Sequence, residues 1–295
     1  MKAETFERPR FESLISDLAE LCKARLSFLV LLTTFVGFLL GWRGPMDYVL
    51  LAATVVGTAL CAAGASALNQ WWERDFDLLM KRTRTRPLPA RRVHPTDALI
   101  AGIVFSVTGL AVLLLFTNPR AAFLAFATIA IYIFVYTPLK RITSLNTLVG
   151  AIPGALPPLI GWVAARGGYQ LEGCLLFATL WFWQMPHFLA ISWMYRKDYA
   201  QAGYVMLSRN DEQGYVSGRQ ALLYSICLLF VTLFPALLGF NNAWYFFGAL
   251  AVGLGFCFTA LAFFIKRDMT TARLLFFASI IYLPLILGLL LCTHR

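Results

Sequence analysis

Apolar stretches of roughly 17–25 residues recur along the whole chain, and each is long enough to cross a hydrocarbon core of about 30 Å. Backbone polar groups in lipid must be satisfied within their own segment, so these stretches must be helices. Only 14% of the 295 residues are charged and the mean hydropathy is +0.70, whereas about 25% of the residues in soluble proteins are charged. We expect nine spans, at residues 26–42, 49–70, 98–117, 121–138, 145–165, 171–194, 221–240, 243–265 and 274–292.

The distribution of charge predicts the topology of these spans. The formal net charge is +10, which by itself could indicate a nucleic-acid partner. With a cytoplasmic N-terminus, however, 21 of the 25 Lys and Arg residues fall in cytoplasmic segments and only 4 fall outside, as the positive-inside rule requires. We therefore predict an all-α, polytopic transmembrane bundle of nine helices with its C-terminus outside, and no nucleic-acid partner.

The first 25 residues are polar and carry both signs of charge, unlike a cleavable signal or an Arg-rich transit peptide. We expect them to form a short cytoplasmic segment, with an interfacial helix as one possibility, ahead of a single transmembrane domain at 26–295. The absence of a transit extension favours a bacterial plasma membrane over a mitochondrial one.

A column of polar side chains continues the second span. Asn69, Glu73 and Asp77 advance by only about 40° per step on a helix, so they share one face, whereas Asp75 lies off this stripe. Carboxylates near membrane depth are costly, so a cation should offset them. Oxygen ligands suit Mg²⁺, which commonly bridges to a substrate phosphate. The column therefore predicts a Mg²⁺ site.

Basic residues follow this column directly. Arg82 and Arg86 could hold the oxygens of a diphosphate whose other oxygens bind the metal. The alternative is a solvated cytoplasmic loop, in which the bases obey topology and the acids form surface ion pairs.

Further polar residues end the fourth and sixth spans, on the same side of the membrane. Tyr136 and Lys140 are four residues apart and share a face, with Arg141 next to them; a snorkelling lysine and an interfacial tyrosine are the alternative. His187 lies among aromatic residues such as Trp183, which is consistent with a pocket for a large flat ligand; the alternative is a histidine that only packs. The remaining candidates at the end of the sixth span are Asp198, as a partner of the acidic column or a helix-end charge, and Tyr199. Pro and Gly residues at 153–161 also predict a broken fifth span that lines a cavity.

These motifs resemble the UbiA superfamily of intramembrane prenyltransferases, and most closely its protohaem IX farnesyltransferase branch, over about residues 20–290. The chain departs from the wider superfamily at Gln70 and Glu73, where aspartate is usual, and at Ala202, where a second aspartate would follow Asp198. They weigh against a full second metal site and against the aromatic-substrate branches. The matching motifs are Asn69…Glu73…Asp77 with Met80-x-Arg82-Thr83-x-x-Arg86-Pro87, Tyr136-Thr-Pro-Leu-Lys140-Arg141, Gly161-Trp162, and Pro186-His187-Phe188 with Asp198-Tyr199-x-x-x-Gly203-x-x-Met206.

The resemblance implies an enzyme that transfers a farnesyl group from farnesyl diphosphate to a vinyl group of haem b, with Mg²⁺ as cofactor. It implies metal ligation by Asn69, Glu73, Asp77 and Asp198, and catalytic roles for these four together with Tyr136 and Lys140. Binding of substrate would fall to Arg82, Arg86, Lys140, Arg141, Trp183, His187 and Tyr199. His187 would position the porphyrin, either by ligating its iron or by a hydrogen bond to a propionate.

The partners implied besides the lipid bilayer are a haem A synthase or terminal oxidase assembly proteins. The alternatives are a prenyltransferase with another acceptor, such as a quinone precursor or chlorophyllide, a cation-coupled transporter, and a non-catalytic assembly factor.

Overall fold

The computed structural model describes residues 11–294, without the side chains of residues 11–14 and 25. This part of the chain contains helices and no strand. The first ten residues of the expected N-terminal segment lie outside the described residues. The helices are α1 (Phe11–Leu21), α2 (Ala24–Gly41), α3 (Tyr48–Asp77), α4 (Pro95–Phe116), α5 (Pro119–Ala130), η1 (Ile131–Tyr136), α6 (Thr137–Leu139), α7 (Asn146–Arg166), α8 (Leu171–Met194), α9 (Arg196–Gln201), η2 (Leu207–Asn210), α10 (Tyr215–Leu237), α11 (Ala243–Lys266) and α12 (Met269–Thr293).

The prediction of an all-helical membrane bundle is confirmed. Within the described residues, eight helical segments are long and apolar enough to cross a membrane, and α2 together with α1, bent by 60°, makes a ninth. Many large apolar side chains stay exposed on the helices, among them Phe28, Val107 and Phe258. A surface of this kind suits lipid, so the chain is a multi-pass membrane protein.

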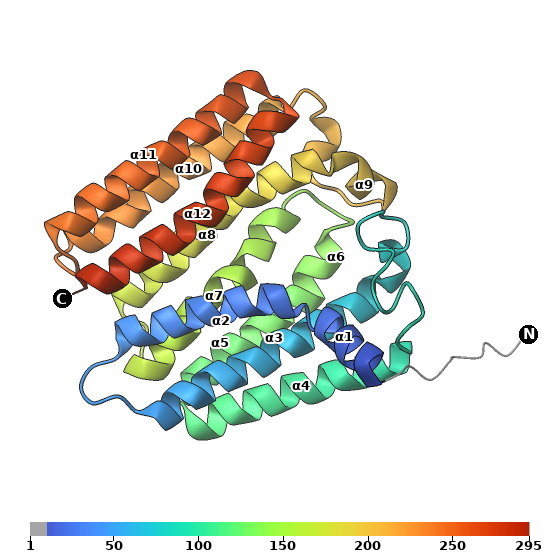
Figure 1. Ribbon diagram of the computed structural model, residues 1–295, viewed down its shortest axis with the longest axis horizontal. Helices are drawn as coiled ribbons and strands as arrows, with labels where there is room; N and C mark the ends of the chain where they lie inside the picture. Colours follow the sequence, from blue (N-terminus) through green and yellow to red (C-terminus); the bar gives the residue numbers. More distant parts are fainter. Residues whose placement is uncertain (1–10, 295) are drawn as a thin grey trace, which may run out of the picture.

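The long helices form two groups that lie side by side (Figure 1). In one group α3 packs on α4 and α2 packs on α7, with α5 also against α7. In the other, α10 lies between α8 and α11, and α12 contacts both α8 and α11. The two groups meet where α7 packs on α8.

The fifth span is not broken, which corrects the expectation drawn from its Pro and Gly residues. α7 runs without interruption through Pro153, Pro157 and Pro158, because close packing against α2 and α8 holds it in place. Gly161 serves close approach between helices instead. A Cβ atom on Gly161 would overlap the carbonyl oxygen of Thr34 on α2.

The break in helical regularity falls in the fourth span, at the six-residue π-helix η1. Pro138 lacks the N–H that an α-helix would direct to the carbonyl of Phe134. The N–H of Thr137 instead reaches back to the carbonyl of Tyr132, which is a π-type bond. π-turns inside helices are frequent at functional sites.

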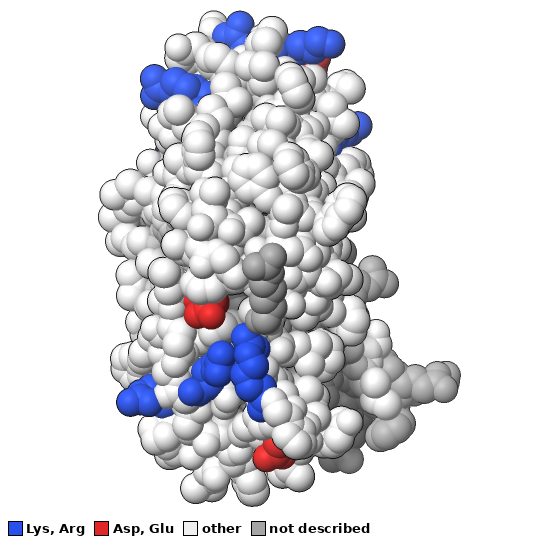
Figure 2. All heavy atoms as spheres, turned by 90° about the vertical axis from the view of Figure 1, so that its left-hand side faces the viewer, with Lys and Arg blue, Asp and Glu red and all other residues white. Residues whose placement is uncertain are grey.

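The two ends of the bundle differ in charge. We call the end that carries α1, α6, α9 and the residues 78–94 the basic end; it lies to the right in Figure 1. Figure 2 looks at the opposite, left-hand side, and shows a mostly uncharged face with a group of basic side chains and a few acidic ones in its lower half, and further basic side chains along its upper edge. This arrangement agrees with a cytoplasmic basic end, which remains a prediction.

Candidate active site

The polar column lies on the inner face of α3 at the basic end of the bundle. Asn69 is 1% exposed, Glu73 5% and Asp77 1%. Asp75, which helical periodicity puts off this face, is exposed. The column therefore does not form part of a solvated loop, and α3 extends beyond residue 70 to hold all three side chains on one helix.

Each member of the column contacts a different basic side chain. The Lys140 ammonium lies 2.7 Å from a carboxylate oxygen of Glu73, and Arg86 lies 2.7 Å from Asp77. Lys23 donates to the side-chain oxygen of Asn69 at 3.0 Å. Burial lowers the pKa of Lys140, but the Glu73 carboxylate and the hydroxyls of Tyr136, Tyr132 and Tyr204 together raise that pKa well above its ordinary value. The site is thus a buried group of two ion pairs and one lysine–amide hydrogen bond.

The π-helix positions the aromatic part of this site. The ring of Tyr136 lies under the ammonium of Lys140, 4.6 Å from ring centroid to Nζ, and stacks on Tyr132 with centroids 5.5 Å apart. Thr137 accepts a hydrogen bond from Asn69 at 3.1 Å and donates one to the carbonyl of Tyr132 at 2.8 Å. Gly150 leaves room for the Tyr136 ring, which a Cβ atom there would overlap. The fourth span is therefore fixed against α3.

The segment after α3 turns its basic residues toward α9. Arg82 donates to the hydroxyl of Tyr199 at 3.1 Å, and its guanidinium lies 5.7 Å from that ring centroid. Thr83 is buried and bonds the carbonyl of Asp77 at 2.9 Å, which folds the chain back at the end of the helix. Arg141 is exposed and lies over the ring of Phe76, 4.3 Å from its centroid.

Not all of the predicted site residues meet at the column. Asp198 is half-buried on α9, and no ion pair or side-chain hydrogen bond joins it to another residue of the described chain. His187 and Trp183 on α8 instead contact Ser279 on α12. The structure therefore groups the predicted residues into a charged centre on α3 and a separate aromatic group between α8 and α12.

Sequence reasoning missed several polar residues that line the charged centre. Lys23 was assigned to the N-terminal segment, yet a left-handed backbone (φ 49°) between α1 and α2 directs it toward Asn69. Tyr132 lies one helical turn before Tyr136, so the helical spacing used for Tyr136 and Lys140 could have found it. Tyr204 approaches from the segment after α9, with Lys140 Nζ 5.8 Å from its ring centroid; burial, with the Glu73 carboxylate, raises its pKa above the ordinary value.

The donor set of the column suits a hard divalent cation. Its ligands are oxygen atoms, and one of them, Oδ1 of Asp77, is buried without a hydrogen-bond partner. Among the described residues, no three His, Cys, Asp or Glu side chains cluster closely enough to hold a metal alone. Mg²⁺ does not need such a cage, because it commonly binds through one or two carboxylates, waters and substrate phosphates.

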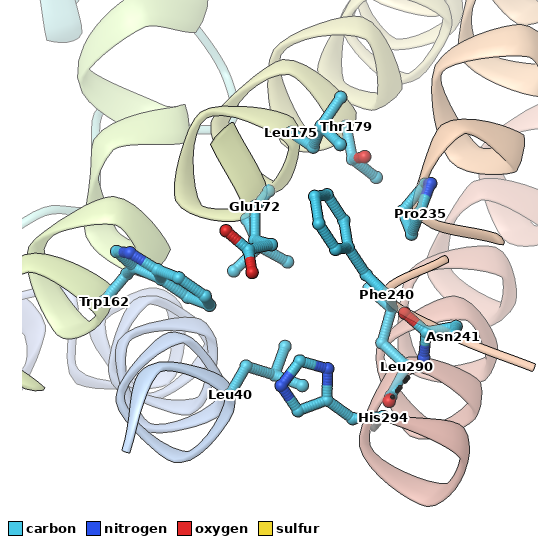
Figure 3. Close-up of a pocket in the computed structure, with 11 residues that line it drawn as sticks. Leu40, Trp162, Glu172, Leu175, Thr179, Pro235, Phe240, Asn241, Leu290 and His294 are labelled. Carbon is cyan, nitrogen blue, oxygen red and sulfur yellow. Dashed lines mark hydrogen bonds between the residues drawn. The ribbon is translucent and has the colours of Figure 1, made fainter. Parts of the chain in front are cut away.

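A small hollow lies at the opposite end of the bundle (Figure 3). Glu172, from α8, and His294, after α12, point into it among mainly apolar side chains such as Leu40 and Phe240. It contains none of the predicted site residues. The buried ion pairs lie instead around the α3 column.

Comparison with known proteins decides the family. The profile of the UbiA prenyltransferase family matches residues 30–281. The chain belongs to this family. Among its relatives, the protohaem IX farnesyltransferase of Solibacter usitatus is 43% identical over 284 residues, covering 93% of this chain and 97% of the relative. That of Opitutus terrae is also 43% identical and covers 96% of each chain.

Solved structures of other UbiA proteins share the fold. A digeranylgeranylglyceryl phosphate synthase matches with a TM-score of 0.80 at 15% identity, over 95% of this chain and 98% of its own. A UbiA homologue from Archaeoglobus fulgidus bound to GPP and Mg²⁺ matches with a TM-score of 0.70 at 14% identity, over 93% and 99%. At these identities the likeness establishes the helical arrangement of a UbiA prenyltransferase and no more.

Proposed function

We propose that this UbiA protein transfers the farnesyl group of farnesyl diphosphate to a vinyl group of haem b, forming haem O and releasing diphosphate. The observation that carries the proposal is the buried column of Asn69, Glu73 and Asp77, each member in contact with its own Lys or Arg. The choice of acceptor is supported by full-length relatives that are 35–43% identical and named protohaem IX farnesyltransferase.

Mg²⁺ is the cofactor that the column fits. Asn69, Glu73 and Asp77 would hold the ion, with Asp198 the fourth predicted ligand. When bound, the ion would stabilise the negative charge that develops on the departing diphosphate. The free oxygen of Asp77 and the all-oxygen donor set support this assignment.

Binding of Mg²⁺ with farnesyl diphosphate would give Lys140 and Arg86 new partners. Lys140 and Arg86 now neutralise Glu73 and Asp77. With a cation on the carboxylates, the same ammonium and guanidinium would turn to the diphosphate oxygens, as would Arg82. Charged donors placed at the leaving group lower the barrier to breaking its C–O bond, an effect that typically changes rates by about 10²–10³ for each donor.

Tyr136, whose ring lies beside Lys140, would face C1 of the farnesyl group, the carbon that loses the diphosphate. As the C1–O bond breaks, positive charge spreads over the allylic carbons, and the ring of Tyr136 can stabilise it by a cation–π contact. The haem vinyl group then attacks C1, water adds to the resulting cation, and a proton leaves. The product is a hydroxyethylfarnesyl haem.

The haem itself would lie against the aromatic group of α8. His187 and Trp183 would position the porphyrin, while Tyr199 and Arg141 are predicted to bind substrate at the basic end. The same proposal places the protein in a bacterial plasma membrane with a cytoplasmic N-terminus. It also includes delivery of the product to a haem A synthase or to terminal oxidase assembly proteins.

The direct test incubates membranes containing the protein with haem b, farnesyl diphosphate and Mg²⁺, and resolves the haems by mass. We expect a farnesylated, hydrated haem from the wild type and from Asp75→Asn, the matched control, and none from Glu73→Gln or Asp77→Asn. Prenylation of a quinone precursor or chlorophyllide, and not of haem, would show that haem b is not the acceptor. Unchanged turnover in the Glu73 and Asp77 variants would remove the metal site from the mechanism.

A further inference from the structure

Ser279 on α12 makes two contacts with one face of α8. Its backbone carbonyl accepts a hydrogen bond from the indole N–H of Trp183 at 2.7 Å, and its hydroxyl lies 2.7 Å from Nδ1 of His187. Ser279 is fully buried. The serine therefore fixes both of the α8 side chains that we assign to the haem.

The hydrogen of the Ser279 hydroxyl is already committed. The hydroxyl oxygen lies 2.5 Å from the carbonyl oxygen of Phe276, one helical turn earlier. A carbonyl can only accept, so the serine must donate to it. The remaining interaction at 2.7 Å then requires Nδ1–H of His187 to donate to the serine oxygen. In this tautomer the proton is on Nδ1 and the lone pair of the imidazole is on Nε2.

Aromatic rings surround the imidazole: those of Trp183 and Phe276 stack on it, and that of Phe188 is tilted against it, with centroids 5.6 Å apart. Trp183 stacks on the ring with centroids 5.2 Å apart and an interplanar angle of 21°, and Phe276 stacks with centroids 5.0 Å apart at 28°. Nε2 makes no hydrogen bond with any residue that the structure describes, and the side chain is only half-buried. Because the lone pair on Nε2 lies in the plane of the ring, a ligand that bonds to this nitrogen approaches in that plane.

An unprotonated Nε2 approached in the ring plane is the arrangement of a histidine that ligates a metal, with its other nitrogen oriented by a hydrogen bond. A neutral imidazole in this tautomer has no proton to donate from Nε2 to a carboxylate such as a haem propionate. Two aromatic rings, Trp183 and Phe276, already stack on the imidazole, which leaves its faces less suited to stacking on a porphyrin.

We propose that Ser279 is a positioning residue that holds His187 in the Nδ1–H tautomer, so that Nε2 ligates the iron of the haem substrate. The proposal rests on the proposed function, because it takes haem b as the acceptor. It selects iron ligation over a propionate contact for His187, and it gives α12 a part in substrate binding.

The experiment titrates the purified protein with ferric haem b and records the electron paramagnetic resonance spectrum and the dissociation constant. The chain has three histidines, so His94→Ala and His294→Ala are direct controls for ligation by another histidine. We expect His187→Ala alone to lose the spectrum of a nitrogen-ligated haem. An unchanged spectrum in His187→Ala would overturn the proposal.

The role of Ser279 is tested with Ser279→Ala. Losing an outer hydrogen bond to a metal-ligating histidine typically weakens binding by about 10–100-fold, so we expect a loss in that range in haem affinity, with the KM for farnesyl diphosphate unchanged. Ser225→Ala is the matched control, because Ser225 is equally buried in a helix and bonds the carbonyl of Ala221 at 2.8 Å. Ser279→Ala with wild-type haem affinity and spectrum would refute the positioning role.

These outcomes differ from a failure of the proposed function. A wild type that binds haem through His187 but forms no haem O would leave the ligation in place and refute the transferase. A wild type that forms haem O, together with a His187→Ala variant that binds haem unchanged, would keep the transferase and refute iron ligation by His187.

Discussion

Replacing Lys140 with methionine should destabilise the protein strongly, because it leaves a buried carboxylate without its partner. The Lys140 and Glu73 side chains are 13% and 6% exposed and 2.7 Å apart. Removing one member of such a buried pair costs about 3–5 kcal/mol. The pair Arg74 and Asp75 supplies the contrast, since its atoms lie 3.9 Å apart with side chains 35% and 74% exposed; exposed pairs are worth about 0–1 kcal/mol.

The assay is a double-mutant cycle on the free energy of unfolding, measured in mixed micelles of increasing SDS fraction without Mg²⁺ or diphosphate. Lys140→Met should lose about 3–5 kcal/mol, and Lys140→Met combined with Glu73→Gln should lose less than Lys140→Met alone, because no unpaired charge remains. Arg74→Met should change stability by at most about 1 kcal/mol. If Lys140→Met costs no more than Arg74→Met, or if the double variant is the least stable, the buried pair does not hold the site together.

Three further predictions follow from the same contacts. Chelation of divalent cations with EDTA should abolish farnesyl transfer and added Mg²⁺ should restore it; turnover that survives chelation would exclude the metal. Lys23→Met should raise the KM for farnesyl diphosphate about 10-fold or more, since a hydrogen bond to a charged group contributes about 1.5–3 kcal/mol, and an unchanged KM would remove Lys23 from the site. Gly161→Ala should cost about 1–3 kcal/mol of stability through overpacking against α2, measured against Gly255→Ala, where a Cβ atom meets nothing within 4 Å; equal stability of the two variants would contradict the close approach.

The spans could be predicted from the sequence because the thickness of a bilayer sets their length. The helices α8 and α11 match their expected bounds to within a residue. The shared face of Asn69, Glu73 and Asp77 could be predicted as well, since helical geometry alone puts them on one stripe. Their burial on that stripe is what the structure adds.

The contacts between distant segments could not be predicted in the same way. Periodicity states which residues share a face but not which helix lies opposite. Lys23 meets Asn69 across 46 residues because the chain turns sharply between α1 and α2. His187 was expected in an aromatic pocket, yet its fixed partner Ser279 is 92 residues away.

The clearest measurement of the central claim is the binding of Mn²⁺, as a spectroscopic substitute for Mg²⁺, to the purified protein in the presence of a non-reactive farnesyl diphosphate analogue. Electron paramagnetic resonance of free Mn²⁺ gives the dissociation constant directly. We predict that Glu73→Gln and Asp77→Asn each weaken binding about 10-fold or more, the lower bound for losing a charge-assisted contact of about 1.5–3 kcal/mol, while Asp75→Asn binds like the wild type. Equal binding by all four proteins would contradict a metal–diphosphate site on the inner face of α3.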